Sequence, residues 1–309
     1  MDISIIIPSK DRKSILSESL NKAYRAIATM EAEILVINDS KTEDILLKPE
    51  WIDKVKIYNN PKSGVASARN LGAEKAKADL LLFMDDDMWI AEENIRATLN
   101  LHKIYPQNCC INLNWVYPPE LQKQNKKTQF GRYLTHFGFD SLRGWCKGLN
   151  WNDQELFPIG GITSQYLAIN KTDFYRAGGY NEKFPHAGFE DHDFSKRLLS
   201  HKIQPYIYPL SMIYHNEADR MDVRSWLARK QRGGETRRVA VEMGYTDLKY
   251  NYGLLKSLIY KSLVSMEGVM FRLLSAIPNL TVFDFLYFRL LNLMLGTILF
   301  AGYYQKPKK

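Results

Sequence analysis

Short runs of β-branched and other apolar residues alternate, near the start of the chain, with longer segments whose apolar residues recur every three or four positions. Short, mainly apolar runs of this length are typical of strands buried on both faces, and they predict strands at 3–7, 33–37, 55–58 and 80–84. The periodic segments predict helices at 14–28 and 67–78. Strands and helices that alternate at this spacing indicate an α/β fold with a doubly wound sheet.

Acidic residues follow three of the predicted strands. Asp11 and Asp39 come after the first two, and Asp85, Asp86 and Asp87 directly follow the fourth. Because the carboxyl ends of parallel strands share one edge of the sheet, where ligands bind in such folds, we expect a site there. Adjacent carboxylates suit a divalent cation with oxygen ligands. The alternative is a solvated acidic turn, with helix-capping or turn roles for Asp11 and Asp39.

Five motifs, in this order and spacing, resemble the nucleotide-sugar-dependent glycosyltransferases of family 2. They are SIIIPSKDR (4–12), VINDS (36–40), GVASARNLG (64–72), FMDDD (83–87) and GFEDHD (188–193). The resemblance covers about residues 3–220. It implies an α/β fold of the GT-A (nucleotide-diphospho-sugar transferase) type, a doubly wound mixed sheet with a helical C-terminal extension.

The same resemblance implies which residues bind the donor. The set is Pro8, Ser9, Asp11, Asp39, Arg69, Asp85, Asp86, Gly161 and Glu190. Asp39 would accept a hydrogen bond from a uracil N–H, and Arg69 would lie close to the base or the diphosphate. The third aspartate blurs the D-x-D element of the family, so the division of ribose and sugar hydroxyls between Asp85 and Asp86 stays open. A surface arginine is the alternative for Arg69.

Catalysis and metal binding are implied in the same way. Asp191 would be the base of an inverting transfer, while Glu190 would contact hydroxyls of the donor or acceptor. Asp87 and His215 would hold Mn²⁺ or Mg²⁺ at the two phosphates. The alternatives are acidic residues that only stabilise a helix N-terminus, and a structural histidine at 215.

The middle of the chain is less regular and rich in aromatic residues. Most of them are expected to pack in the core or against loops. Trp145 is the one that we expect to contact the acceptor, since the family places acceptor contacts in this variable region. Farther on, two apolar segments predict strands at 205–208 and 212–216.

Positive charge is concentrated at the C-terminal end. The net charge is +8 in total, with −1 over residues 1–219 and +9 over residues 220–309. We therefore expect a glycosyltransferase domain at 1–220 and a basic, partly apolar, helical region at 221–309. That region fits an amphipathic segment lying on an anionic membrane, or a helical appendage packed on protein. Charged residues interrupt both of its apolar stretches, so we expect neither to span a bilayer.

Three cysteines without metal-ligand spacing, and no secretory leader, favour a cytoplasmic location, with the inner face of the membrane as a candidate site. The expected activity is a metal-dependent hexosyl transfer from a UDP-sugar to an acceptor hydroxyl, in bacterial-type surface polysaccharide or glycolipid synthesis. The partners would be the nucleotide sugar and a glycan or lipid-linked acceptor. The alternatives are a nucleotidyltransferase and a non-catalytic module that binds nucleotide sugars or glycans. Nucleic acid is not an expected partner.

Overall fold

The computed structural model describes residues 1–184 and 186–304, which form two compact units. The first unit comprises Met1–Pro118, Ser141–Lys183 and Glu190–Glu217. The second comprises Pro119–Asp140, Phe184–Phe189 and the chain from Ala218 onward. The last five residues of the predicted C-terminal region, 305–309, lie outside the described residues.

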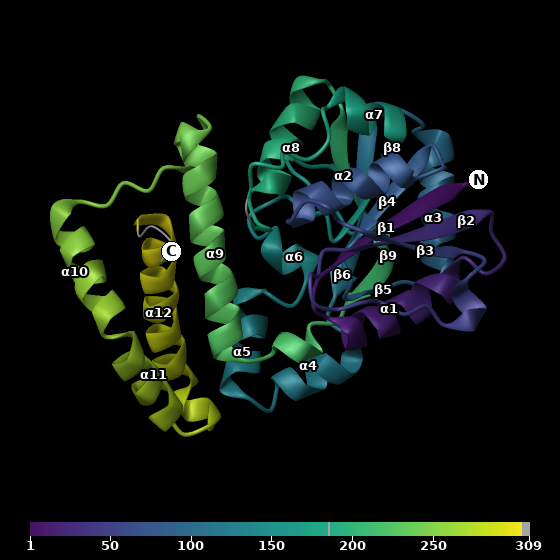
Figure 1. Cartoon of the computed structure of the whole chain (residues 1–309). Coiled ribbons are helices and arrows are strands. Elements are labelled where there is room, and N and C mark those ends of the chain that lie inside the picture. Colours follow the sequence, from purple (N-terminus) through teal and green to yellow (C-terminus); the bar gives the residue numbers. More distant parts are fainter. Residues whose placement is uncertain (185, 305–309) are drawn as a thin grey trace. The chain divides into compact units, whose positions relative to one another are not determined.

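Four parallel strands form one half of the sheet in the first unit (Figure 1). In sheet order they are β3 (Val55–Asn59), β2 (Ala32–Asn38), β1 (Ile3–Ser9) and β4 (Leu80–Met84). Every residue of β1, β2 and β4 is buried, as their mainly apolar sequences predict. The parallel order places the carboxyl ends of these strands at one edge of the sheet.

The other half of the sheet is mixed in direction. Its strands are β8 (Tyr166–Asn170), β6 (Cys109–Val116), β9 (Gln204–His215), β5 (Met88–Trp89) and β7 (Phe157–Pro158). β8 runs antiparallel to β4 and to β6, whereas β9 runs parallel to β6. The described residues thus form a nine-stranded mixed sheet, which confirms the expected fold class. The two strands predicted near 205–216 are one strand, whose register against β6 shifts between Leu113 and Asn114.

The helices of the first unit cover the sheet. They are α1 (Lys13–Ala26), α2 (Val65–Lys75), α3 (Glu92–Ile104), α6 (Leu142–Trp145), α7 (Lys171–Arg176) and α8 (Glu190–Ser200), with a short 3₁₀ turn at Pro49–Trp51. α2 approaches β1 closely because Gly72 has no side chain. A Cβ atom at Gly72 would lie 2.2 Å from Cγ2 of Ile6. This close contact fixes α2, which carries Arg69.

The second unit is helical, as expected for the C-terminal region. Its helices are α4 (Pro119–Asn125), α5 (Gln129–Phe137), α9 (Val223–Glu242), α10 (Leu254–Ser265), α11 (Glu267–Ala276) and α12 (Asp284–Tyr304), with 3₁₀ turns at Ala218–Arg220, Thr246–Leu248 and Thr281–Phe283. α9 and α12 pack backbone to backbone at two glycines. A Cβ atom added to Gly234 would lie 2.8 Å from the carbonyl oxygen of Leu299. A Cβ atom added to Gly302 would lie 2.1 Å from the carbonyl oxygen of Gln231.

The segment at 119–140 packs within this second unit. Tyr133 of α5 contacts the rings of Trp226 and Phe288, with centroids 5.7 and 5.5 Å apart. Arg132 forms an ion pair with Asp284, 2.6 Å from Nε to Oδ2. Residues 119–140 therefore group with the C-terminal helices in the structure, and the expected boundary after residue 220 stays a prediction.

One helix among the described residues, Thr281–Tyr304, is long and apolar enough to cross a membrane by length and composition. The charged residues Asp284 and Arg289 were expected to rule out a membrane-spanning helix, but the helix meets the length and composition criteria with them included. In the structure, 44% of its apolar window is buried within the protein.

Candidate active site

The ends of the neighbouring strands β1 and β4 bring an arginine side chain and two carboxylates together. Ser9, the last residue of β1, donates a hydrogen bond from Oγ to Oδ2 of Asp86 at 2.6 Å. Arg12, in the loop after β1, contacts Asp86 and lies 2.9 Å from Oδ2 of Asp87. Both carboxylates are buried, so the Arg12 guanidinium supplies the counter-charge that their burial requires. The sequence interpretation missed Arg12.

The protonation of Asp86 reflects this crowding. Its pKa is raised to about 7. Burial is the main cause, the positive charge of Arg12 acts in the opposite direction, and the negative charge of Asp87 adds to the increase. A bound cation would favour the ionised carboxylate pair for the same electrostatic reason.

Three side chains at the ends of β4 and β9 form a candidate metal site: Asp87, His215 and Glu217. One possible ligand atom from each lies within 4.8 Å of the others. Nε2 of His215 is 3.3 Å from Oδ1 of Asp87, and Tyr117 donates a hydrogen bond from its hydroxyl to Oε2 of Glu217 at 2.5 Å. Two carboxylates and one imidazole suit Mn²⁺ or Mg²⁺, so the donor set fits the expected metal.

The histidine of this group is packed among aromatic rings. Its ring centroid is 5.0 Å from that of Trp115 and 5.9 Å from that of Tyr117. Burial by itself would lower the pKa of His215, but the charges of Asp87 and Glu217 outweigh it and raise that pKa to about 8. The sequence interpretation named Asp87 and His215 as metal ligands but not Glu217. Glu217 comes two residues after His215, where a strand-like backbone would place it on the same side.

Arg69 organises a second group of carboxylates. Only 3% of its side chain is exposed, so it is not a surface arginine. Nη2 lies 3.0 Å from Oδ1 of Asp85, and Nη1 lies 3.0 Å from Oε1 of Glu190 and 3.9 Å from Oδ1 of Asp191. Burial opposes the charged form, but these carboxylates and the ring of Tyr180 outweigh it and raise the pKa of Arg69.

Asp191 combines anchoring with access to solvent. Its Oδ2 accepts a hydrogen bond from the backbone N–H of Ser164 at 2.9 Å, and its Oδ1 accepts one from the Ser164 hydroxyl. The side chain is 23% exposed, whereas that of the adjacent Glu190 is 2% exposed. Both residues lie in the first turn of α8. Of this pair, Asp191 is the carboxylate that a substrate can reach.

Asp39 and Asp11 are held by other partners. Asp39 Oδ1 accepts hydrogen bonds from Nδ2 of Asn60 at 2.7 Å and from the backbone N–H of Gly64 at 3.0 Å. Asp11 accepts a hydrogen bond from the Ser40 hydroxyl at 2.5 Å. A carboxylate oxygen has more than one lone pair, so Asp39 keeps capacity for a ligand donor.

The remaining predicted residues lie in varied surroundings. Pro8 pairs in register with Ile37 of β2, and a Cβ atom at Gly161 would lie 3.5 Å from Oγ of Ser195. Trp145, on α6, is 53% exposed and meets Trp115 edge-on, with centroids 6.5 Å apart. Because Trp115 in turn contacts His215, Trp115 links the exposed ring of Trp145 to the candidate metal site.

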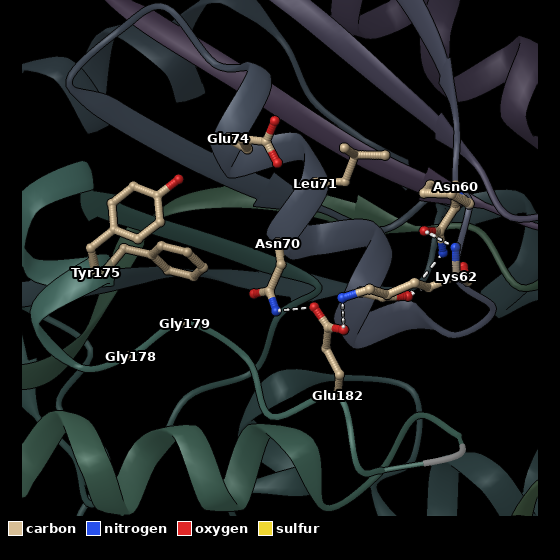
Figure 2. A pocket seen from close by; sticks show the side chains of 12 residues that line it. Asn60, Lys62, Asn70, Leu71, Glu74, Tyr175, Gly178, Gly179 and Glu182 are labelled. Atoms are coloured by element: carbon tan, nitrogen blue, oxygen red, sulfur yellow. Dashed lines mark hydrogen bonds and ion pairs between the residues drawn. The ribbon is translucent and has the colours of Figure 1, made fainter.

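A cavity of about 330 Å³ lies along α2 (Figure 2). Glu182 in its wall accepts hydrogen bonds from Lys62 at 2.7 Å and from Asn70 at 3.0 Å. Asn60, which donates to Asp39, also lines it. The cavity therefore adjoins Asp39, where the nucleotide base was expected. Its lining does not include Asp85, Asp86, Asp87, Glu190 or Asp191.

The sequence matches the family described as "Glycosyltransferase like family 2" over residues 4–248. An uncharacterized glycosyltransferase of Haemophilus influenzae is 26% identical over 201 residues, which are 64% of this chain and 62% of that protein. Validoxylamine A glucosyltransferase of Streptomyces hygroscopicus subsp. jinggangensis is 25% identical over 65% of this chain and 52% of its own length. The chain thus spans half to three-fifths of the length of these curated relatives.

Solved structures share the fold. A mannosyltransferase from Pyrobaculum calidifontis, in complex with GDP-Man and Mn²⁺, superimposes with a TM-score of 0.57 over 99% of this chain and 88% of that one, at 11% identity. GalNAc-T7 with UDP, GalNAc and Mn²⁺ gives a TM-score of 0.50 over 69% of this chain and 43% of that one, at 16% identity. These similarities confirm the GT-A fold.

Proposed function

Because the chain belongs to glycosyltransferase-like family 2, we propose that it transfers a sugar from a nucleotide donor to an acceptor hydroxyl with inversion. The observation that carries this proposal is the setting of Asp191. Its carboxylate is fixed by two hydrogen bonds from Ser164, is partly open to solvent, and faces the cationic Arg69. A general base for an acceptor hydroxyl needs this combination of orientation and access.

In this mechanism Asp191 takes the proton of the acceptor hydroxyl as the oxygen attacks the anomeric carbon. The attack comes from the face opposite the leaving diphosphate, so no covalent enzyme intermediate is needed. Arg69 holds Glu190, which is placed to contact hydroxyls of the donor or acceptor, and its Nη1 lies 3.9 Å from Oδ1 of Asp191. Ser164 keeps the carboxylate oriented.

We assign metal binding to Asp87, His215 and Glu217, whose ligand atoms lie close together. Mn²⁺ or Mg²⁺, when bound there, supplies Lewis-acid stabilisation of the departing diphosphate. The two solved structures that share this fold contain Mn²⁺, which supports this assignment. Ser9 and Arg12 position the adjacent Asp86 and Asp87.

For the donor we propose a UDP-sugar. We assign the nucleotide base to Pro8, Ser9, Asp11 and Asp39, and the GalNAc-T7 structure, which contains UDP, supports a uridine donor. Asp85, Asp86 and Gly161 complete the predicted donor site. The mannosyltransferase structure contains GDP-Man, so the test includes donors with different nucleotide bases.

For the acceptor we propose a glycan or a lipid-linked glycan, with Trp145 as a stacking surface. Its exposed ring has the amphipathic character that sugar faces require. Two relatives support a role in polysaccharide or surface glycan synthesis: a chondroitin synthase of Escherichia coli and an O-antigen biosynthesis protein of Myxococcus xanthus. The three free thiols fit the proposed cytoplasmic location.

The test separates donor binding from turnover. UDP-, GDP- and dTDP-sugars are titrated onto the protein with Mn²⁺, and nucleotide release is then measured for wild type, Asp191→Asn and the surface control Asp53→Asn. We expect one donor to bind all three proteins, and Asp191→Asn to lose about 10²–10⁴-fold in turnover.

Equal turnover of Asp191→Asn and wild type would remove Asp191 as the base. Donor binding without turnover in any of the proteins, with a panel of glycan acceptors present, would favour a binding module. Pyrophosphate release from a nucleoside triphosphate would favour a nucleotidyltransferase.

A further inference from the structure

Helix α10 of the second unit carries apolar side chains that the protein does not cover. None of its twelve residues, all of them described by the structure, is buried. The exposed fractions are 88% for Leu254, 74% for Leu255, 61% for Leu258 and 50% for Ile259. Soluble proteins rarely leave several large apolar side chains in contact with water on one helix, so this face is a candidate interaction surface.

The helix has a distinct inner face. Tyr260 stacks on Phe300 of α12 with ring centroids 5.4 Å apart, and it also contacts Tyr252. A Cβ atom at Gly296 of α12 would lie 2.9 Å from the Tyr260 hydroxyl, which shows how closely the two helices approach. Figure 1 shows α12 between α9 and α10. Packing on α12 thus fixes which face of α10 is left uncovered.

Lysines border the uncovered face on both sides. At 3.6 residues per turn, Leu254, Leu258, Leu255 and Ile259 cover an arc of about 140°. Lys256 lies just beyond one edge of that arc and Lys261 just beyond the other, each within about 60° of the nearest leucine or isoleucine. Long basic side chains at the margins of an apolar arc can extend to lipid phosphates while the apolar residues enter the acyl boundary.

Neighbouring elements of the same unit repeat this pattern. Val269 and Leu273 of α11 are 46% and 55% exposed, and Phe285 and Leu286 at the start of α12 are 70% and 55% exposed. Arg272 on α11 is also exposed. Residues 220–309 carry a net charge of +9, which complements an anionic surface.

We propose that the face of α10 formed by Leu254, Leu255, Leu258 and Ile259 binds the surface of an anionic phospholipid membrane. This face is called the α10 apolar face below. Contact with a second copy of the same face would bring Lys256 and Lys261 of two chains together, and the repulsion of like charges disfavours it. The proposal goes beyond the proposed transferase activity and does not depend on it.

The test is co-sedimentation of the full chain with phosphatidylcholine vesicles and with vesicles that contain phosphatidylglycerol as well. We expect binding to the anionic vesicles. The double variant Leu254→Glu/Leu258→Glu should abolish that binding. Leu46→Glu is the matched control, since Leu46 is 85% exposed in the first unit.

A charge variant tests the role of the lysines. Lys256→Gln/Lys261→Gln should weaken binding to anionic vesicles roughly 30-fold, because each basic residue near such a surface strengthens binding about fivefold. Its binding to neutral vesicles should not change. Circular dichroism and thermal melting establish that each variant is folded, which these exposed positions favour.

Three outcomes would overturn the proposal. The first is failure of wild type to bind the anionic vesicles, and the second is binding of Leu254→Glu/Leu258→Glu equal to that of Leu46→Glu. The third is a concentration-dependent dimer, seen by light scattering without vesicle binding and lost in Leu254→Glu/Leu258→Glu. That result would make the α10 apolar face a self-association surface instead.

Discussion

At the scale of single residues, ion pairs determine the arrangement of this site. Arg12 and Arg69 each contact two or more carboxylates, and the exposed fractions of their side chains are 8% and 3%. Breaking a buried pair by removing one partner leaves a charge without compensation, which costs about 3–5 kcal/mol. Both arginines are therefore as important for stability as for any role in binding the donor.

Glu217 is the residue whose role is most directly testable. In Glu217→Gln the site loses one anionic ligand atom, so we expect Mn²⁺ to bind more than about tenfold more weakly. Tyr117→Phe removes the hydrogen bond that orients Glu217 and should have a smaller effect in the same direction. The measurement is a Mn²⁺ titration followed by electron paramagnetic resonance, with and without UDP.

The matched control for this titration is Glu242→Gln, a change at an exposed position on α9. It should leave Mn²⁺ binding unchanged. Unaltered affinity in Glu217→Gln would exclude Glu217 as a ligand and restrict the proposed metal site to Asp87 and His215.

At the scale of elements, the apolar runs predicted the parallel strands well. The reason is physical: β1, β2 and β4 are buried on both faces, which favours a mainly apolar sequence, and the buried polar pair Ser4 and Glu33 is hydrogen-bonded. The motifs led to Asp87, Arg69 and Asp191. Arg12, Tyr117, Ser164 and Glu217 were not predicted, because their contacts join positions far apart in sequence. Tyr117 and Glu217, for example, are a hundred residues apart.

Two adjacent glycines in α9 should respond in opposite ways to alanine. A Cβ atom at Gly233 has no heavy atom within 4 Å, so Gly233→Ala should stabilise the protein by about 0.5–1 kcal/mol through helix propensity. Gly234→Ala would place a Cβ atom 2.8 Å from the carbonyl oxygen of Leu299 and should destabilise by about 1–3 kcal/mol. Chemical denaturation of both variants measures the two free energies of unfolding.

Each glycine variant is the control for the other, since residue type, helix and substitution are the same. Stabilisation of similar size in both would show that α9 and α12 do not pack as closely as Gly234 and Gly302 indicate.

At the scale of the whole molecule, the division into two units bears on how the chain can be shortened. In the second unit Phe130 packs on Trp226 with centroids 5.7 Å apart, and Tyr133 donates a hydrogen bond to Asn292 at 2.8 Å. A fragment that ends at residue 220 keeps α5 but lacks both partners. The predicted domain 1–220 therefore stays a prediction that a truncation can test.

We expect the fragment 1–220 to expose the apolar face of α5. Hydrogen exchange at residues 129–137 should become fast, and binding of an apolar dye should increase relative to the full chain. A fragment that ends at residue 304 serves as the control and should behave like the full chain. Slow exchange at 129–137 in the shorter fragment would show that α5 holds its place without the C-terminal helices.

The order of segments along the chain has a consequence for recombination between relatives. The polypeptide passes between the two units repeatedly, after residues 118, 140, 183, 189 and 217. Glu190 and Asp191 come directly after one of these crossings, and Glu217 comes directly before another. A single crossover therefore cannot exchange one complete unit for that of a homologue. The helical unit and the residues proposed for catalysis are expected to be inherited together.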